Sequence, residues 1–411
     1  MTSTLDRDLA SPTARRPWEL RHGGGFWVIA AAFLAVMAFS TIPTPLYALY
    51  QARDGFPTWV VTVIFAAYAV GVIASLFLIG HLSDWAGRRR MVLVAILLEI
   101  VAAALFLVWN DVSGLIVARL ISGVGVGALT ASATAHLSEL RAIARPGEGP
   151  RLAGTVSTVV NTGGLALGPL IGGLFAQFLP LPLLLPYAVF LVLLAVAALA
   201  VALVPETVER AEERPAYRPQ RVSLPASARG AFSAAAVAAF AGFAVFGLFT
   251  SLAPSVLAGT YHVQSHLVAG VVPFAVFAAS AVSQIVFARL GMRAQLVLAL
   301  VLVVVGLGGL AAGVLGGSLA VFIVSGVLAG AAVGLLFRSA VGVAASLAEP
   351  ERRGEVLAAI FLVAYVGLAL PVLLLGVALI LWPLVPVLVV FVAVIAVLSL
   401  LAGLRMLRSA A

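Results

Sequence analysis

The sequence predicts an all-α membrane protein in which twelve transmembrane helices form two pseudo-symmetric six-helix bundles. Three observations support this fold class: the composition, the number of long apolar runs and a weak internal repeat. Of the 411 residues, 63% are hydrophobic and only 10% are charged, whereas a soluble domain is about half apolar and a quarter charged. Because no soluble fold buries such an excess of apolar side chains, lipid must cover part of it.

Polar clusters divide the chain into twelve apolar runs, each close to the length of about 20 residues that a membrane-spanning helix needs. In the first half, spans are expected near 26–48, 58–79, 91–109, 113–137, 152–178 and 182–204. In the second half, they are expected near 231–257, 267–287, 295–314, 318–346, 355–378 and 383–404.

The distribution of arginine predicts a multi-pass protein of the cell (inner or plasma) membrane with both termini in the cytoplasm. Of the 24 basic residues, 21 fall in the tails or in loops on the same side as the tails. The opposite loops hold Arg53, whereas Arg119 and Arg338 lie within spans. Cytoplasmic loops carry such an excess of positive charge.

The two halves of the chain match each other at a nearly constant offset. Residues 121–123 match 324–326 and residues 164–167 match 367–370 at an offset of 203, and 87–89 match 291–293 at 204. Duplicated membrane bundles suit alternating access, in which a site between the bundles opens to one side and then to the other. The expected divisions are an N-terminal tail (1–25), a first bundle (26–204), a linker (205–229), a second bundle (230–404) and a C-terminal tail (405–411).

The loop after the second expected span reads GHLSDWAGRRR. A glycine permits close packing of helices, an aspartate suits the exposed N–H groups at a helix start, and the arginines supply cationic partners. As isolated residues, they also fit an ordinary cytoplasmic loop. The candidate gating residues in this loop are Gly80, Asp84, Gly87, Arg88 and Arg89.

As a pattern, this loop resembles the signature between helices 2 and 3 of the major facilitator superfamily, with a departure at Trp85, where that family usually has a basic residue. The segment LIVARLISGVGVGA resembles the family's second signature, an intramembrane arginine (Arg119) followed by small residues. The resemblance implies the major facilitator fold.

The segment GLALGPLIGG in the expected span 152–178 carries a further pattern. Glycines four residues apart line one helix face and allow close contact with a neighbour, and a proline bends the helix. A general packing seam would look similar, but the whole string resembles the motif of drug:proton antiporters. Its residues are Gly164, Gly168, Pro169, Gly172 and Gly173.

The resemblance implies that helices 1, 4, 7 and 10 line a substrate cavity and that their neighbours flank it. For each candidate, ordinary packing is at least as well supported as substrate contact, but together they indicate a mainly apolar cavity that suits lipophilic solutes. The candidates are Thr44, Tyr47, Arg119, Asn161, Phe249, Gln284 and Tyr365.

Glu99 is the carboxylate deepest in an expected span, and Arg119 lies at a similar depth on the next span. Charges at this depth are costly, and two opposite charges relieve each other's cost. We therefore expect Glu99 and Arg119 to pair within the membrane. Two interpretations remain open: Glu99 is a proton site, or the pair is permanent and structural.

These features predict a secondary transporter, with proton-coupled export of small lipophilic molecules as the leading interpretation. The expected partners are a small-molecule substrate and the lipid bilayer, with no nucleic acid, and a monomer is expected to function. The proton gradient is the expected energy source, with no cofactor, no bound metal and no enzymatic activity, because no hydrolase, metal-binding or nucleotide-binding pattern occurs. The alternatives are an importer or facilitator of a small nutrient solute on the same fold and, from another class, a membrane-embedded enzyme or lipid scramblase.

Overall fold

A computed structural model describes residues 19–79, 86–208, 228–348 and 353–409 of the chain. Within these ranges the regular structure is helical throughout, without a strand. Twelve of the described helical stretches are long and apolar enough to cross a membrane. The expected all-α fold with twelve spans is thus confirmed.

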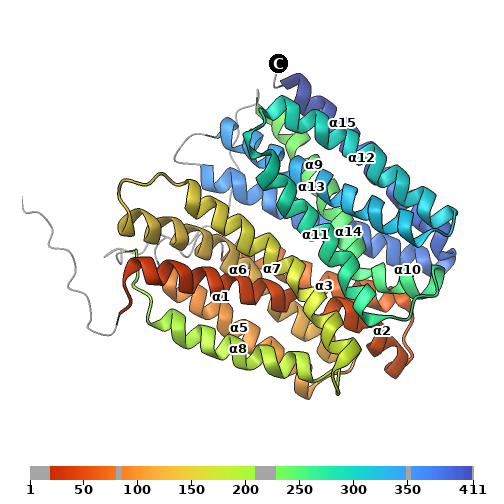
Figure 1. Cartoon of the computed structure of the whole chain (residues 1–411), viewed down its shortest axis with the longest axis horizontal. Helices are drawn as coiled ribbons and strands as arrows, with labels where there is room; N and C mark the ends of the chain where they lie inside the picture. The colour runs from red at the N-terminus through yellow and green to blue at the C-terminus, as the bar shows by residue number, and fades with distance from the viewer. Residues whose placement is uncertain (1–18, 80–85, 209–227, 349–352, 410–411) are drawn as a thin grey trace, which may run out of the picture.

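Each half of the chain supplies six spans (Figure 1). The first half comprises α1 (His22–Thr41) with α2 (Pro43–Asp54), α3 (Thr58–Leu78), α5 (Arg88–Val108), α6 (Val112–Ala144), α7 (Arg151–Phe178) and α8 (Leu185–Ala202). The second half comprises α9 (Arg229–Ser251) with α10 (Ala253–Thr260), α11 (His266–Val286) with the short 3-10 helix η2 (Phe287–Arg289), α12 (Met292–Leu315), α13 (Leu319–Leu347), α14 (Arg353–Leu381) and α15 (Leu384–Ser409).

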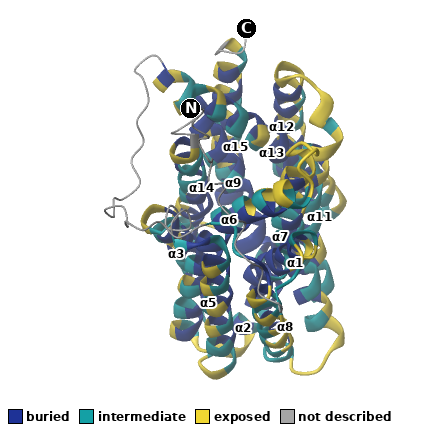
Figure 2. Cartoon of the chain, turned by 90° about the vertical axis from the view of Figure 1, so that its left-hand side faces the viewer, coloured by how far each residue is buried: buried dark blue, intermediate teal, exposed yellow. Residues whose placement is uncertain are grey.

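The two halves form two bundles that lie side by side, in agreement with the expected arrangement (Figure 1). They meet mainly where α7 packs on α11 and where α3 packs on α14. The first and seventh spans, which contain α1 and α9, are the most buried, whereas the spans of α8 and α15 are the least buried and lie at the outside (Figure 2). The core of each bundle therefore faces the other bundle, and the outer helices face lipid.

Prolines and glycines place corresponding breaks and crossings in both bundles. Pro43 begins α2 and Pro254 lies in the first turn of α10, positions where a missing N–H is tolerated. A Cβ on Gly127 would lie 2.9 Å from the carbonyl oxygen of Val72, so α6 and α3 cross in close contact. The crossing of α13 and α11 also uses a glycine, Gly330. The structure thus repeats the pattern that the sequence repeat suggested.

Candidate functional site

The membrane end at which α5 and α7 begin and α6 ends is rich in arginine, and we call it the arginine-rich end. Two of its predicted gating residues, Gly80 and Asp84, lie outside the described residues. Gly87 precedes α5 with a φ of +104°, which L side chains rarely adopt. A Cβ there would also lie 2.5 Å from Oε2 of Glu206. The backbone conformation at this position therefore favours glycine, whereas the flexible Glu206 side chain can move away from an added Cβ.

An ion-pair network at the arginine-rich end joins α5, α6 and the segment after α8. The guanidinium of Arg88 donates from Nε to Oε1 of Glu139 at 3.1 Å. Arg89 donates from Nη1 to the carbonyl oxygen of Val204 at 2.8 Å, and its backbone N–H donates to Glu206 at 3.3 Å. Both arginines were predicted as gating residues from the sequence, but neither glutamate was. The sequence signal that could have identified each glutamate is an acidic residue at the same membrane end of a neighbouring span as the arginines.

The glycine face of α7 packs against the first span. A Cβ on Gly164 would lie 2.5 Å from Cβ of Met37, and one on Gly172 would lie 2.6 Å from the carbonyl oxygen of Ile42. At Gly168 an added Cβ would overlap the Ala38 carbonyl oxygen. The α7 backbone thus touches α1 directly, which explains the spacing of these glycines.

We expect Gly168→Leu to reach the membrane but to lose transport. The new side chain must displace α1, and overpacking of this kind costs about 1–3 kcal/mol. Transport and the amount of protein in the membrane should be measured together. Gly163→Leu is the matched control, because a Cβ at Gly163 has no neighbour within 4 Å. Wild-type transport by Gly168→Leu would show that the close contact is dispensable.

A cavity of about 30 Å³, which we call the central cavity, lies between the two bundles. It is mainly aromatic and apolar, and a space of this size admits a water molecule or two. From the predicted set, the structure places Thr44, Arg119 and Tyr365 in its lining. The other lining residues are Thr41, Phe65, Tyr68, Leu165, Phe243, Phe246, Thr250, Phe277 and Leu368.

The remaining candidates for the substrate site do not line the central cavity in this conformation. Tyr47 is buried beside it, with a hydroxyl group that has no hydrogen-bond partner. Asn161 is partly buried on α7, and Gln284 donates to the carbonyl oxygen of Ser280 at 3.3 Å. Their apparent depth in a span did not indicate the direction in which each side chain points.

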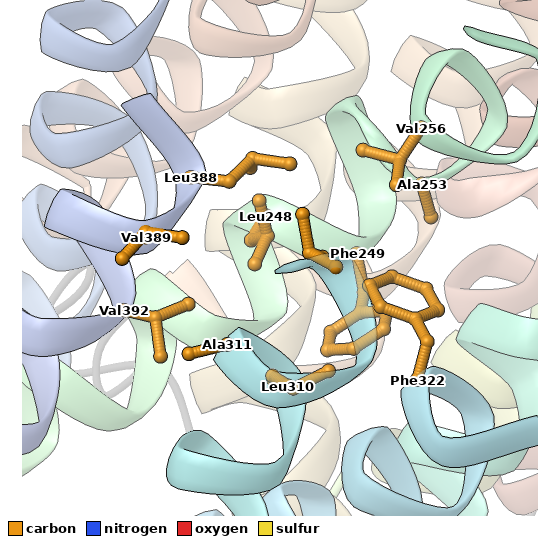
Figure 3. Close-up of a pocket in the computed structure, with 11 residues that line it drawn as sticks. Leu248, Phe249, Ala253, Val256, Leu310, Ala311, Phe322, Leu388, Val389 and Val392 are labelled. Atoms are coloured by element: carbon orange, nitrogen blue, oxygen red, sulfur yellow. The ribbon is translucent and has the colours of Figure 1, made fainter. Parts of the chain in front are cut away.

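Phe249 lines a different pocket, which lies inside the second bundle (Figure 3). This pocket of about 10 Å³ is lined by apolar side chains from α9, α10, α12, α13 and α15. The ring of Phe322 lies 5.8 Å from that of Phe249. At the repeat offsets of 203 and 204, Phe322 corresponds to Arg119, and Val303 corresponds to Glu99. The second bundle therefore packs apolar groups where the first places charges.

Glu99 and Arg119 are both buried, at 0% and 2% exposure, but they do not form the expected direct ion pair. No Arg119 nitrogen lies within 4.0 Å of a Glu99 carboxylate oxygen among the ion pairs of the described residues. Arg119 instead donates from Nη1 to the Ser40 carbonyl oxygen at 2.5 Å, because α1 presents this oxygen toward α6. The Glu99 carboxylate faces Ser122 and Gly125 and makes no hydrogen bond.

At the end of the bundles opposite the arginine-rich end, close contacts join the two halves. A Cβ on Gly173 of α7 would lie 3.1 Å from Cα of Gly270 on α11. The side-chain oxygen of Gln177 accepts a hydrogen bond from the backbone N–H of His266 at 3.0 Å. On the other side, Thr62 of α3 packs directly on Gly376 of α14. These contacts hold α7 on α11 and α3 on α14 at this end.

Comparison with solved structures shows the same fold. The chain is 19% identical to the human organic anion transporter MFSD10 (TETRAN), with a TM-score of 0.69 over 94% of this chain and 100% of that one. It is 12% identical to the nucleoside transporter NupG, with a TM-score of 0.68 over 94% and 99%. A bacterial homologue of the human lysosomal transporter Spinster, solved inward-facing and unoccupied, gives 14% identity and a TM-score of 0.69 over 96% and 99%.

Sequence comparison agrees with the structural one. An uncharacterised MFS-type transporter of Mycobacterium tuberculosis is 29% identical over 42% of this chain and 28% of its own length. The puromycin resistance protein pur8 of Streptomyces alboniger is 34% identical over 41% of this chain and 32% of its own length. These matches span about a third or less of each relative. The sequence profile of the Major Facilitator Superfamily matches residues 28–370. The chain therefore belongs to the Major Facilitator Superfamily, whose members are membrane transporters rather than enzymes.

Proposed function

We propose that this transporter exports small, mostly apolar molecules in exchange for protons, with the arginine-rich end facing the cytoplasm. The observation that carries the proposal is the position of Glu99. It is the one carboxylate among the described spans that is fully buried, and it lies next to residues of the central cavity. A carboxyl group without a hydrogen bond can take up and release a proton without breaking a structural contact. Rocking of the bundles would open the cavity to each side in turn.

Two further observations favour export over uptake. The antiporter-like segment of α7 contacts both the first span and α11, so it connects the moving parts. The puromycin resistance protein among the relatives is also consistent with export. A second candidate function is uptake, because the arabinose–proton symporter of Bacillus subtilis is 30% identical over 23% of this chain and 19% of its own length. The aromatic lining of the central cavity offers few of the polar groups that a sugar needs.

Inverted membrane vesicles test the proposal. A lipophilic dye should accumulate in vesicles that contain the protein when the vesicle interior is made more acidic than the outside. Collapse of this pH gradient should stop the accumulation. Empty vesicles are the control. Accumulation that is indifferent to the pH gradient, or movement only in the reverse direction, would contradict proton-coupled export.

A further inference from the structure

We propose that the central cavity, when rocking of the two bundles widens it beyond the about 30 Å³ of this conformation, selects amphipathic organic anions, with Arg119 binding the acidic group and the aromatic rings holding the apolar body. This inference rests on the proposed function only in taking the central cavity as the substrate site. It narrows the substrate class from mostly apolar molecules to mostly apolar acids, such as aryl-alkyl carboxylates.

Arg119 is a buried cation with spare hydrogen-bond donors. Its side chain lines the central cavity at 2% exposure. One nitrogen, Nη1, donates to the Ser40 carbonyl oxygen, whereas Nε is buried without a hydrogen-bond partner. A guanidinium has five N–H donors in a fork that matches a carboxylate. Because the described residues put no carboxylate within ion-pair distance, the cavity has a binding group for an anion that the protein itself does not fill.

The groups around Arg119 suit the apolar part and the oxygens of such an anion. The guanidinium lies over the ring of Tyr68, at 4.3 Å from the ring centroid, which holds it in place by a cation–π contact. The hydroxyl group of Tyr68, which lines the cavity, is buried without a partner at hydrogen-bond distance and is a further potential donor. From the second bundle, the stacked rings of Phe246 and Phe277, with centroids 4.3 Å apart, add an apolar wall.

The same geometry disfavours organic cations. The lining residues include one positive charge and no negative charge. Glu99 does not line the cavity, but it lies within electrostatic reach of Arg119 from α5. Its negative charge therefore opposes the binding of a second anion at Arg119. Neutralising Glu99 should strengthen anion binding, whereas neutralising Arg119 should weaken it.

Binding to the purified full chain tests this with a matched pair of probes, radiolabelled 4-phenylbutyrate and 4-phenylbutyramide, which share one ring and chain but differ in charge. Wild-type protein should prefer the acid by about tenfold or more, the range expected for a hydrogen bond to a charged group. Arg119→Gln should weaken binding of the acid by a similar factor and leave the amide unchanged. Arg338→Gln is the matched control, because this second intramembrane arginine donates to the Gln284 carbonyl oxygen away from the cavity.

Glu99→Gln supplies a result of opposite sign, tighter binding of the acid, which misfolding does not produce. Equal binding of acid and amide by the wild type, or equal weakening of both by Arg119→Gln, would overturn the inference. So would weaker acid binding in Glu99→Gln. Proton-driven transport of neutral dyes, with no preference for the acid in binding, would support the proposed function and contradict the anion site. Arg119-dependent binding of the acid without proton-driven transport would instead support the anion site and contradict the proposed proton coupling.

Discussion

Glu99→Gln should abolish transport driven by a pH gradient while substrate exchange across the membrane continues. Glutamine keeps the shape of the side chain but carries no exchangeable charge, so the bundles can still rock but no longer move a proton. Because the Glu99 carboxylate has no hydrogen bond and no direct ion pair, its loss should not destabilise the fold. Proteoliposomes loaded with substrate would measure exchange and gradient-driven transport in the same preparation.

Thermal unfolding of Glu99→Gln separates the proton-site interpretation from the structural one. Breaking a buried ion pair costs about 3–5 kcal/mol, because the remaining charge is left unpaired. A structural pair would therefore lower the melting temperature of Glu99→Gln, and adding Arg119→Gln would restore it. We expect no such decrease. Gradient-driven transport that survives in Glu99→Gln would show that the coupling proton binds elsewhere.

Gly270→Val should prevent the two bundles from closing at the end opposite the arginine-rich end. A Cβ at Gly270 would lie 3.0 Å from Cα of Gly173 and would overlap the Pro169 carbonyl oxygen. An overpacking cost of about 1–3 kcal/mol in the closed state corresponds to a shift of roughly 5- to 150-fold toward the open state. The sequence contains no cysteine, so Thr44→Cys would be a unique reporter in the cavity lining.

The measurement is the rate at which a membrane-impermeant maleimide labels Thr44→Cys when it is added on the side of the membrane opposite the arginine-rich end. This rate should rise in the Gly270→Val background, and transport should fall. Gly308→Val is the matched control, because a Cβ at Gly308 has no neighbour within 4 Å. An unchanged labelling rate would show that α7 and α11 do not form a gate here.

The spans were predictable because lipid imposes a composition that is visible without any partner. The repeat and the glycine spacing of α7 also carried over to the structure, since a close approach of backbones leaves only small residues as an option. Thus Gly164, Gly168 and Gly172 all contact the first span, as their common helix face indicates. Such signals are local in the sequence.

The contacts of the cavity were less predictable because they depend on which face of each helix meets which neighbour. Phe249 and Tyr365 both looked like cavity residues, yet only Tyr365 lies between the bundles. Similar depth suggested a direct bond between Glu99 and Arg119, but the Ser40 carbonyl oxygen takes the Arg119 donor instead. A backbone carbonyl oxygen that is free to accept a hydrogen bond near the end of α1 cannot be recognised from the residue types alone.

The unequal halves of the repeat have a consequence for how new specificities arise. Charge resides in the first bundle at Arg119 and Glu99, whereas the corresponding positions of the second bundle are Phe322 and Val303. Substitutions among the rings that the second bundle contributes, such as Phe246 and Phe277, can reshape the cavity without changing either charged residue. Under selection for a changed substrate, the second bundle can vary while the first keeps Glu99, the proposed proton site. Variants with an altered substrate range should therefore concentrate in the second half of the chain.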